Sequence, residues 1–489
     1  MTLVALALAL SFAPQSTDDV VAKMITEAKT NSQAMKSLQD LTSKFGPRLT
    51  SSSNLEKAEK WMMDQFKRAG CTNVHLEAWG SIPVGFDRGR SSFGRMNKPV
   101  ARQFEFTSPS WTEGTKGAMK GLAVVCPKDK TELESAKEKL KGAWVVMDRQ
   151  PRRSRPGAEA PSAEVQAQID LDSAIDALGI AGRVYGSRSE LVITSGSFRD
   201  KTFEKHPMDR SVTIRKSDMD ALKASMAEGK SVELEFNLDQ KFRKGPVVQH
   251  NVIAEIKGTE KPDEVVIISG HIDSWDGPGA VGASDNGTGS CTALEAARLL
   301  LKAGAKPKRT IRFILWGGEE QGLYGSRSYV IQHEKEMDKI SAVFVDDGGS
   351  NYIGGYNGHP DMKPMLQKGM DQVVAAFPDL PMRYTERANP RTQIGSDQDS
   401  FNAVGVPGFF TLETGSEKYG TQDYNFIHHT QHDTMKYVIP MYMVQSSVAH
   451  AVVGLQVANA DTMLPRYPKF EYKLNPDGVP GLAELLLKK

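Results

Sequence analysis

The sequence predicts an α/β fold: a doubly wound, mostly parallel sheet with helices on both faces, plus a β-rich insert. After about residue 246, the apolar runs NVIAEI, EVVIISGHID, RTIRFILW and ISAVFVDD alternate with the helical run TGSCTALEAARLLLKAG. Nearly continuous apolar strands in a β-α-β order are typical of a parallel sheet that is buried on both faces. Between about 90 and 245, short apolar runs are separated by Gly, Pro and charged residues, which indicates a separate β-rich unit.

The region before the insert, residues 18–70, is expected to be helical. In NLEKAEKWMMDQFKRAG, one helical face carries Ala58, Trp61, Met62 and Phe66. A short strand, NVHLEAW, is expected to follow this helix.

Within the insert, the runs GLAVVC, GAWVVMD, GRVYGS and LVITSG are expected to form its strands, with helices near 163–178 and 217–228. A basic cluster lies between prolines in an expected loop, where a solvated surface is favoured over an anion site. Its members are Arg149, Arg152, Arg153 and Arg155.

Five segments follow from these patterns. Residues 1–16 are expected to be a signal peptide, and 17–90 with 246–461 a discontinuous catalytic domain. Residues 91–245 form the insert, and 462–489 a C-terminal tail. The signal prediction depends on MTLVALALALSF, an apolar run too short to cross a bilayer. It predicts a secreted or periplasmic protein.

Composition excludes several classes of partner. The chain has 489 residues and a net charge of +1, so we expect no nucleic acid partner. Beyond the N-terminal run, no stretch approaches membrane-spanning length, so no stable membrane insertion is expected. The three cysteines, Cys71, Cys126 and Cys291, make neither a disulfide framework nor a metal-ligand spacing.

Histidines and acidic residues gather at the ends of the expected strands or in adjoining loops, where parallel sheets carry their functional groups. The motifs are GHIDSWD (His271, Asp273), ASDNGTG (Asp285), WGGEEQGLYGS (Glu319, Glu320), FVDDGGS (Asp346, Asp347) and HHTQHDTMKYV (His428, His429, His432, Asp433). Imidazole and carboxylate are ligands that zinc prefers. Adjacent glutamates would repel each other at a sheet end, and a dication that binds one of them removes the repulsion. Each motif alone is weak, but their joint placement predicts a metal site.

This ordered set resembles the M28 family of co-catalytic zinc peptidases, and within it GHIDSWD and HHTQHDTM most resemble the carboxypeptidase Q branch. The resemblance covers roughly 20–85 and 247–460. The intervening region, with GAWVVMDR, AGRVYGS and VTIRKSDMDALKASMAEG, resembles the protease-associated domain that many relatives carry at this point.

The resemblance implies two Zn²⁺ ions per chain. The first would be held by His271 and Asp347, the second by Glu320 and His429, and Asp285 would bridge the two. Glu319 matches the family's general base.

Neighbouring residues leave alternatives to these assignments. Asp347 is preferred to Asp346 because the motif match is closer. His429 is preferred to His428 and His432 because it stands four residues before Asp433.

Two further aspartates are expected to support the ligands without binding metal. Asp273 lies on the same side of an extended chain as His271 and can hydrogen-bond its imidazole. The resemblance assigns the same supporting role to Asp433, the aspartate of the motif His429-x-x-x-Asp433-Thr434.

The resemblance implies hydrolysis of short peptides, especially dipeptides, with aminopeptidase action on longer peptides as the alternative. A single-zinc aminoacyltransferase of the glutaminyl cyclase type and a non-catalytic binding protein are remoter alternatives. The loop RANPRTQIGSDQDSF offers counter-charges of both signs for a peptide terminus: Arg387, Arg391, Asp397 and Asp399. A homodimer is possible, since relatives include dimers.

Overall fold

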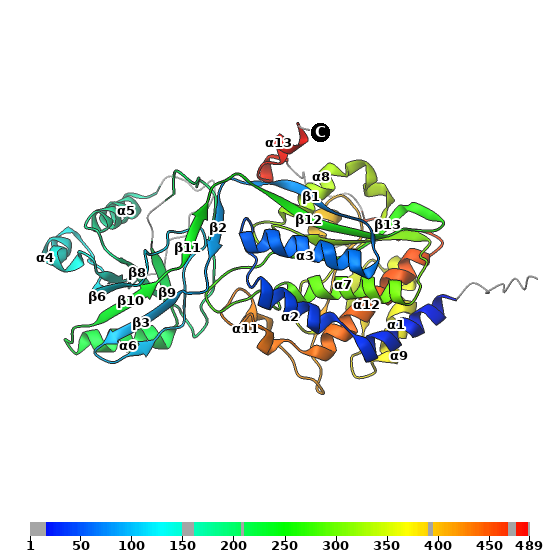
Figure 1. Ribbon diagram of the computed structural model, residues 1–489, viewed down its shortest axis with the longest axis horizontal. Helices are drawn as coiled ribbons and strands as arrows, with labels where there is room; N and C mark the ends of the chain where they lie inside the picture. Colours follow the sequence, from blue (N-terminus) through cyan, green and yellow to red (C-terminus); the bar gives the residue numbers. More distant parts are fainter. Residues whose placement is uncertain (1–15, 149–160, 207–209, 390–394, 468–475, 488–489) are drawn as a thin grey trace, which may run out of the picture.

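The computed structural model describes residues 16–148, 161–206, 210–389, 395–467 and 476–487. Two units are visible in Figure 1. The large unit is built on a six-stranded sheet, and the inserted unit on an eight-stranded sheet. Residues 1–15 of the expected signal peptide lie outside the described residues. The four arginines of the basic cluster, at 149–155, also lie outside them.

The sheet of the large unit is mixed, with three parallel pairings out of five. In spatial order its strands are β1 (Thr72–Ile82), β12 (Val247–Ile256), β14 (Arg309–Trp316), β13 (Lys261–His271), β15 (Ile340–Val345) and β19 (Gly408–Phe410). The pairings of β12 with β1 and with β14 are antiparallel. The predicted parallel pairing is therefore confirmed for β14, β13 and β15, and β19 extends it. NVIAEI, which was expected in the parallel sheet, lies in β12 and runs antiparallel to both of its neighbours.

Helices cover both faces of this sheet, as the apolar strands predict (Figure 1). Alternate residues of one strand enter different cores, because successive side chains point to opposite faces. In β13, Val266 and Ile268 pack in one core, and Val265 and Ile267 pack in the other. One face carries α1 (Thr17–Asn31), α2 (Ala34–Lys44), α3 (Ser53–Ala69), α7 (Gly287–Lys302), α9 (Lys363–Ala376) and α12 (Pro440–Asn459); the other carries α8 (Tyr324–Gln332), η1 (Glu334–Lys339) and α10 (Gln398–Asn402).

The helices predicted for 18–70 are confirmed as α1, α2 and α3. Ala58, Met62 and Phe66 of α3 are fully buried, and Trp61 packs partly buried against the same core. The helix ends at Gly70, whose φ of +100° is the left-handed conformation that favours glycine.

The inserted unit lies between β1 and β12 in the chain and has its own apolar cores. Its sheet runs, in spatial order, β4 (Arg102–Gln103), β3 (Phe93–Lys98), β10 (Glu233–Asn237), β6 (Met119–Val125), β7 (Trp144–Val146), β8 (Gly182–Gly186), β9 (Ser211–Ile214) and β5 (Phe106–Thr107). The antiparallel ribbon of β2 (Gly85–Arg88) and β11 (Gln240–Arg243) joins the two units (Figure 1).

The two helices predicted for the insert are confirmed as α5 (Ala163–Asp176) and α6 (Lys216–Ala227). A further helix, α4 (Lys130–Leu140), was not predicted, because only two of its residues, Leu133 and Leu140, are buried and its apolar signal is weak. The run LVITSG makes isolated bridges instead of a strand of the inserted sheet. It packs against the large unit, a tertiary contact that local propensity does not encode.

The remaining elements are short. They are β16 (Tyr352–Ile353), β17 (Gly355–Gly358), η2 (Pro360–Met362), β18 (Arg383–Glu386), β20 (Glu413–Thr414), α11 (Tyr424–Ile427), η3 (Met435–Tyr437), η4 (Pro476–Gly478) and α13 (Leu482–Leu486). In the part of the chain that the structure describes, no helix combines the length and apolar character needed to cross a membrane.

A buried arginine fixes the loop that follows β13. Arg48 is fully buried. Its Nε donates to Ile272 O at 2.7 Å, its Nη2 to Gly282 O at 2.8 Å, and its Nη1 to Gly46 O and Val281 O at 3.2 Å each. The guanidinium therefore holds both ends of the loop that carries Asp273.

We expect Arg48→Met to lower the free energy of unfolding by about 3 kcal/mol or more, because each buried carbonyl left without a donor costs about 1–3 kcal/mol. Urea denaturation of metal-free protein measures this. The matched control, Arg68→Met on an exposed part of α3, is expected to change it by less than about 0.5 kcal/mol. Equal losses of stability in the two variants would contradict the proposed role of Arg48.

Candidate metal centre

Three adjacent parallel strands of the large unit, β14, β13 and β15, bring residues that the sequence predicts for the metal site to one edge of the sheet. His271 is the last residue of β13, Glu319 follows β14 after two glycines, and Asp347 follows β15. Because parallel strands end at the same edge, their following loops converge there. Asp285 enters from the loop before α7, which Asn286 caps by accepting from Gly289 N–H.

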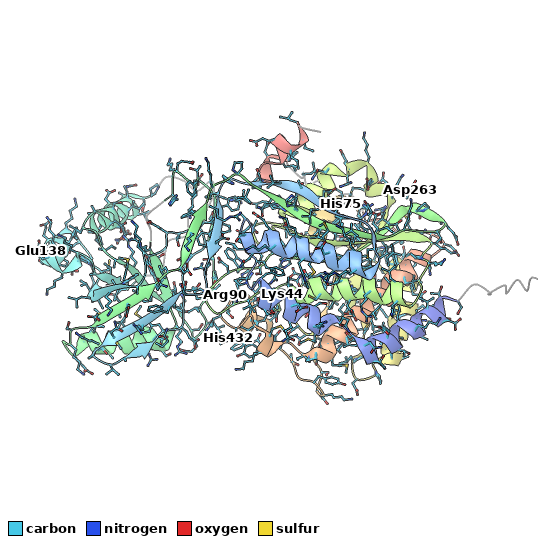
Figure 2. All side chains as sticks on the ribbon, in the orientation of Figure 1. Lys44, His75, Arg90, Glu138, Asp263 and His432 are labelled. Atoms are coloured by element: carbon cyan, nitrogen blue, oxygen red, sulfur yellow. The ribbon has the colours of Figure 1, made fainter. Side chains whose placement is uncertain are left out.

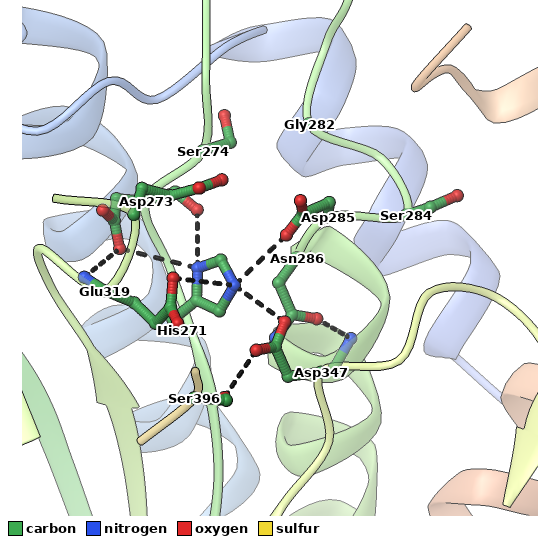
Figure 3. Close-up of polar contacts among 12 residues, drawn as sticks. His271, Asp273, Ser274, Gly282, Ser284, Asp285, Asn286, Glu319, Asp347 and Ser396 are labelled. Atoms are coloured by element: carbon green, nitrogen blue, oxygen red, sulfur yellow. Dashed lines mark hydrogen bonds and ion pairs between the residues drawn. The ribbon is translucent and has the colours of Figure 1, made fainter. Parts of the chain in front are cut away.

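His271 is fully buried at the centre of this group (Figure 3). Its Nε2 lies 2.9 Å from Asp347 Oδ1, 3.3 Å from Asp285 Oδ1 and 3.9 Å from Glu319 Oε2. Three carboxylates thus converge on one imidazole nitrogen. This is the geometry of a group that shares a cation.

His429 forms a second centre on the other side of Asp285. Its Nε2 lies 3.0 Å from Glu320 Oε2 and 3.3 Å from Asp285 Oδ2. Asp285 therefore turns one carboxylate oxygen toward His271 and the other toward His429. This placement brings all five residues expected as ligands into two groups that share one aspartate.

The adjacent aspartates after β15 point in different directions. Asp347 faces His271 and accepts a 2.5 Å hydrogen bond from Ser396 Oγ at its Oδ2. Asp346 Oδ2 instead accepts from Thr292 Oγ1 at 2.7 Å and lies 3.0 Å from His450 Nε2. Asp347 is thus the member of the pair that lies in the cluster.

The two supporting aspartates bind backbone groups of the cluster. Asp433 Oδ1 accepts from the N–H groups of Ser284 at 2.6 Å and Asp285 at 3.4 Å, which positions the Asp285 loop. Asp273 Oδ1 accepts from Glu319 N–H at 3.2 Å.

The hydrogen bond expected between Asp273 and the His271 imidazole has a different geometry. His271 Nδ1 lies 3.0 Å from the carbonyl oxygen of Asp273 and 3.6 Å from its carboxylate. The carboxylate is engaged elsewhere, since its Oδ2 accepts from Thr50 Oγ1 at 2.8 Å and its Oδ1 from Glu319 N–H. The carbonyl therefore orients the imidazole more directly than the side chain does.

The histidines next to His429 differ in position. His428 Nε2 lies 3.9 Å from Asp285 Oδ2, so this half-exposed side chain also reaches the cluster. His432 stacks on Phe426 with ring centroids 4.1 Å apart. Sequence spacing set His428 aside, whereas its distance from Asp285 makes it an additional candidate ligand.

Burial and repulsion between neighbouring carboxylates shift the pKa values of the acidic residues in the cluster. Burial raises the pKa of Glu319 well above its ordinary value, and burial together with Asp285 raises the pKa of Glu320 to about 7. Burial also acts to raise the pKa of Asp285, but the neighbouring imidazoles of His271 and His429 hold it well below the ordinary value. Such crowded acids are stabilised when cations neutralise them.

The donor set fits metal ions. Among the described residues, His271, Asp285 and Asp347 place ligand atoms within 4.8 Å of one another, and so do Asp285, His428 and His429. Asp285 Oδ2 and Glu320 Oε1 are buried without a hydrogen-bond partner in the described part of the chain. Buried acceptors without donors are typical of atoms that bind a ligand.

The loop that was expected to offer counter-charges does so only in part. Asp397 is fully buried, and burial raises its pKa to about 8, so it is not an exposed anion for a substrate amine. Asp399 Oδ2 accepts from Gly395 N–H at 3.1 Å. Arg391 lies outside the described residues. Burial of an acidic residue in a polar loop has no local sequence signal.

Three polar residues that support the cluster were missed by sequence reasoning: Thr50, Ser396 and Arg48. Each acts from a segment distant in sequence, through the bonds given above. Thr50 and Arg48 stand in no motif with acids or histidines, and although Ser396 precedes Asp397 in RANPRTQIGSDQDSF, nothing local indicates that its hydroxyl reaches Asp347.

Comparison with known proteins gives a consistent family. Residues 251–451 match peptidase family M28. The chain is 28% identical to mouse carboxypeptidase Q over 460 residues, which cover 92% of this chain and 91% of the mouse protein. It is 28% identical to human carboxypeptidase Q over 449 residues, which cover 90% and 88%.

Solved structures share the fold. The peptidase M28 precursor of Shewanella amazonensis SB2B superposes with a TM-score of 0.64 at 24% identity, covering 93% of this chain and all of that one. A zinc aminopeptidase of Bacillus subtilis superposes with a TM-score of 0.53 at 18% identity, covering 88% of this chain and 94% of that one. Taken with the geometry above, residues 251–451 belong to peptidase family M28, and the chain is a metallopeptidase.

Proposed function

We propose that this chain is a two-zinc exopeptidase that hydrolyses short peptides, especially dipeptides. The observation that carries the proposal is the placement of Asp285, whose two carboxylate oxygens lie 3.3 Å from His271 Nε2 and 3.3 Å from His429 Nε2. In this proposal His271 and Asp347 hold one ion, Glu320 and His429 hold the other, and Asp285 bridges them.

Zinc is proposed from the donor set and from a structural relative. Imidazole nitrogens and carboxylate oxygens suit zinc, and catalytic zinc sites commonly take three protein ligands. Each half of the cluster offers one histidine and two carboxylates. The Bacillus subtilis protein with the same fold is described as a zinc aminopeptidase. A single-zinc aminoacyltransferase is disfavoured because both halves keep their full donor sets.

When bound, two zinc ions would lower the pKa of the attacking water and polarise the scissile carbonyl. Glu319 is the residue placed to move the proton. Its N–H is held by Asp273, and its carboxylate stays 3.9 Å from His271 Nε2. It accepts the proton of the water as the water oxygen attacks the carbonyl carbon. It then donates that proton to the amine nitrogen as the C–N bond breaks, leaving a carboxylic acid and an amine, which ionise to a carboxylate and an ammonium group.

The preference for dipeptides is proposed from the carboxypeptidase Q relatives. The mouse and human proteins align over about nine-tenths of this chain, so the likeness covers the inserted unit as well as the M28 segment. Aminopeptidase action on longer peptides is the second candidate, favoured by the aminopeptidase fold.

Metal counting and a blocked-substrate panel test this proposal. Purified protein is expected to hold two zinc ions per chain, to lose hydrolysis after chelation and dialysis, and to regain it when zinc is returned. A dipeptide with both termini free is expected to be hydrolysed at least about 100-fold faster than its N-acetylated form. This follows because a recognition site built for a charged terminus is left unpaired when that charge is absent.

C-terminal amidation separates the two candidate specificities. A dipeptidase that recognises the free carboxylate loses activity on the amidated dipeptide, whereas an aminopeptidase tolerates amidation and longer peptides. One zinc per chain at full activity, or activity that survives metal removal, would exclude the two-zinc proposal.

Three further features belong to the same proposal: a protease-associated identity for residues 91–245, export directed by residues 1–16, and assembly as a homodimer. The inserted unit's separate cores and the ribbon that joins it to the large unit support the first. N-terminal sequencing of exported protein tests the second. Light scattering tests the third, and a monomer mass would exclude the dimer.

A further inference from the structure

Residues 190–196 of the inserted unit, called here the docking segment, lie against the loop that carries His429. Ile193 forms an isolated antiparallel bridge with Thr430. Thr194 N–H donates to the carbonyl oxygen of His429 at 2.9 Å. Backbone groups of the inserted unit thus bind the backbone of a candidate metal ligand and of its neighbour.

Gln431 makes a second connection between the same two segments. Its Oε1 accepts from Val192 N–H at 3.0 Å, and its Nε2 donates to the carbonyl oxygen of Glu190 at 2.9 Å. The same Nε2 lies 3.2 Å from Glu105 Oε2, also in the inserted unit. His432, the next residue, lies where the two units meet in Figure 2. One side chain therefore binds the docking segment at two backbone positions.

The docking segment is itself held on its other side. Thr194 Oγ1 pairs with Thr107 Oγ1 of β5 at 2.8 Å. Gly277, in the loop after β13, packs so closely on it that a Cβ there would lie 1.8 Å from Thr194 Oγ1. Ser110 bridges Gly196. These contacts place the segment between the inserted sheet and the large unit, where it can act as a fixed support.

The backbone of His429 needs such a support. Its φ is +59°, in the left-handed region, which a residue with a Cβ adopts at a cost of about 1–3 kcal/mol. Conformations of this kind persist when surrounding contacts hold them. Among the described residues, the backbone group that donates a hydrogen bond to the His429 carbonyl oxygen is the N–H of Thr194.

The other half of the metal centre is supported differently. His271 and Asp347 extend from β13 and β15, and Asp347 is held by Ser396, all within the large unit. Asp433, in the same loop as His429, also holds the Asp285 loop. Loss of the docking contacts should therefore act most strongly on the Glu320–His429 half and less on the other.

We infer that the docking segment of the inserted unit is a positioning element for His429, so that the Glu320–His429 half of the metal centre depends on the insert. The inference rests on the proposed function, because it takes His429 to be a metal ligand. Mutation of a residue that orients a ligand without binding metal commonly lowers the affinity for the metal by about 10- to 100-fold. That range sets the expected effect.

Gln431→Ala and Thr194→Pro test the inference in the full-length protein. The first removes the side-chain contacts with Val192 and Glu190, and the second removes the N–H that His429 accepts, since proline has none. Thr194→Ala keeps this N–H and is the matched control. Zinc stoichiometry and the two dissociation constants are measured by chelator competition, with thermal unfolding followed by circular dichroism.

Gln431→Ala and Thr194→Pro are expected to weaken binding of one of the two zinc ions by about 10- to 100-fold and to weaken binding of the other by a smaller factor. Thr194→Ala should lose less affinity than Thr194→Pro. Wild-type affinity for both ions in folded Gln431→Ala would overturn the inference, and so would equal weakening of both ions. Gln431→Ala decides the matter if Thr194→Pro does not fold.

A metal-free readout separates this inference from the proposed function. Backbone hydrogen exchange at residues 428–433 is expected to be faster in metal-free Gln431→Ala than in metal-free wild type, because the loop loses its support. Wild-type protein that binds fewer than two ions contradicts the proposed function. Unchanged exchange at 428–433 in Gln431→Ala contradicts the positioning role.

Discussion

Glu319→Gln is expected to lower kcat by about 10²- to 10⁴-fold while both zinc ions remain bound, because glutamine keeps the shape of the side chain but cannot accept the proton of the attacking water. The carboxylate lies at the edge of the cluster, 3.9 Å from His271 Nε2, and it is buried. Initial rates on an unblocked dipeptide at saturating concentration measure the effect, with zinc content determined on the same preparation.

The control for this variant is Glu334→Gln in η1, an exposed glutamate of the same unit. It should leave kcat within about two-fold, as surface substitutions usually have small effects. Near-wild-type turnover in Glu319→Gln would show that another group moves the proton. Loss of zinc together with activity would indicate instead that Glu319 is a ligand.

Asp285→Ala is expected to have the broadest effect on metal binding. A single substitution should weaken both zinc ions by more than about 100-fold, because it removes a direct ligand from each half, whereas changes at supporting residues cost about 10- to 100-fold. Hydrolysis should fall to the level of chelated protein. Zinc per chain after gel filtration in metal-free buffer, with circular dichroism to confirm folding, measures the loss.

The two aspartates after β15 provide a graded comparison with Asp285→Ala. Asp347→Ala should weaken one ion, because Asp347 faces His271 alone among the candidate ligand histidines. Asp346→Asn should keep both ions, since Asp346 contacts Thr292 and His450. Retention of one tightly bound ion in Asp285→Ala would rule out a bridging role. Loss of an ion in Asp346→Asn would reverse the assignment of the pair.

The fold of the large unit could be read from local patterns because its sheet is buried on both faces. A strand that is apolar at nearly every position, such as RTIRFILW, must be covered on both faces. β14 accordingly contributes side chains to a core on each face of the sheet. Weakly amphipathic α4 and the docking segment could not be predicted in the same way. The first buries few apolar residues, and the second is held by contacts with another unit.

The sequence by itself determined which kinds of ligand are present and that they follow strand ends, because residue type and strand periodicity are local properties. Tertiary structure decided how those ligands are used. It turns Asp347 toward His271 and Asp346 away, brings His428 within 3.9 Å of Asp285, buries Asp397 and places the docking segment on His429. These outcomes depend on the direction of side chains and on contacts between distant segments, and such contacts are set by how the whole chain packs.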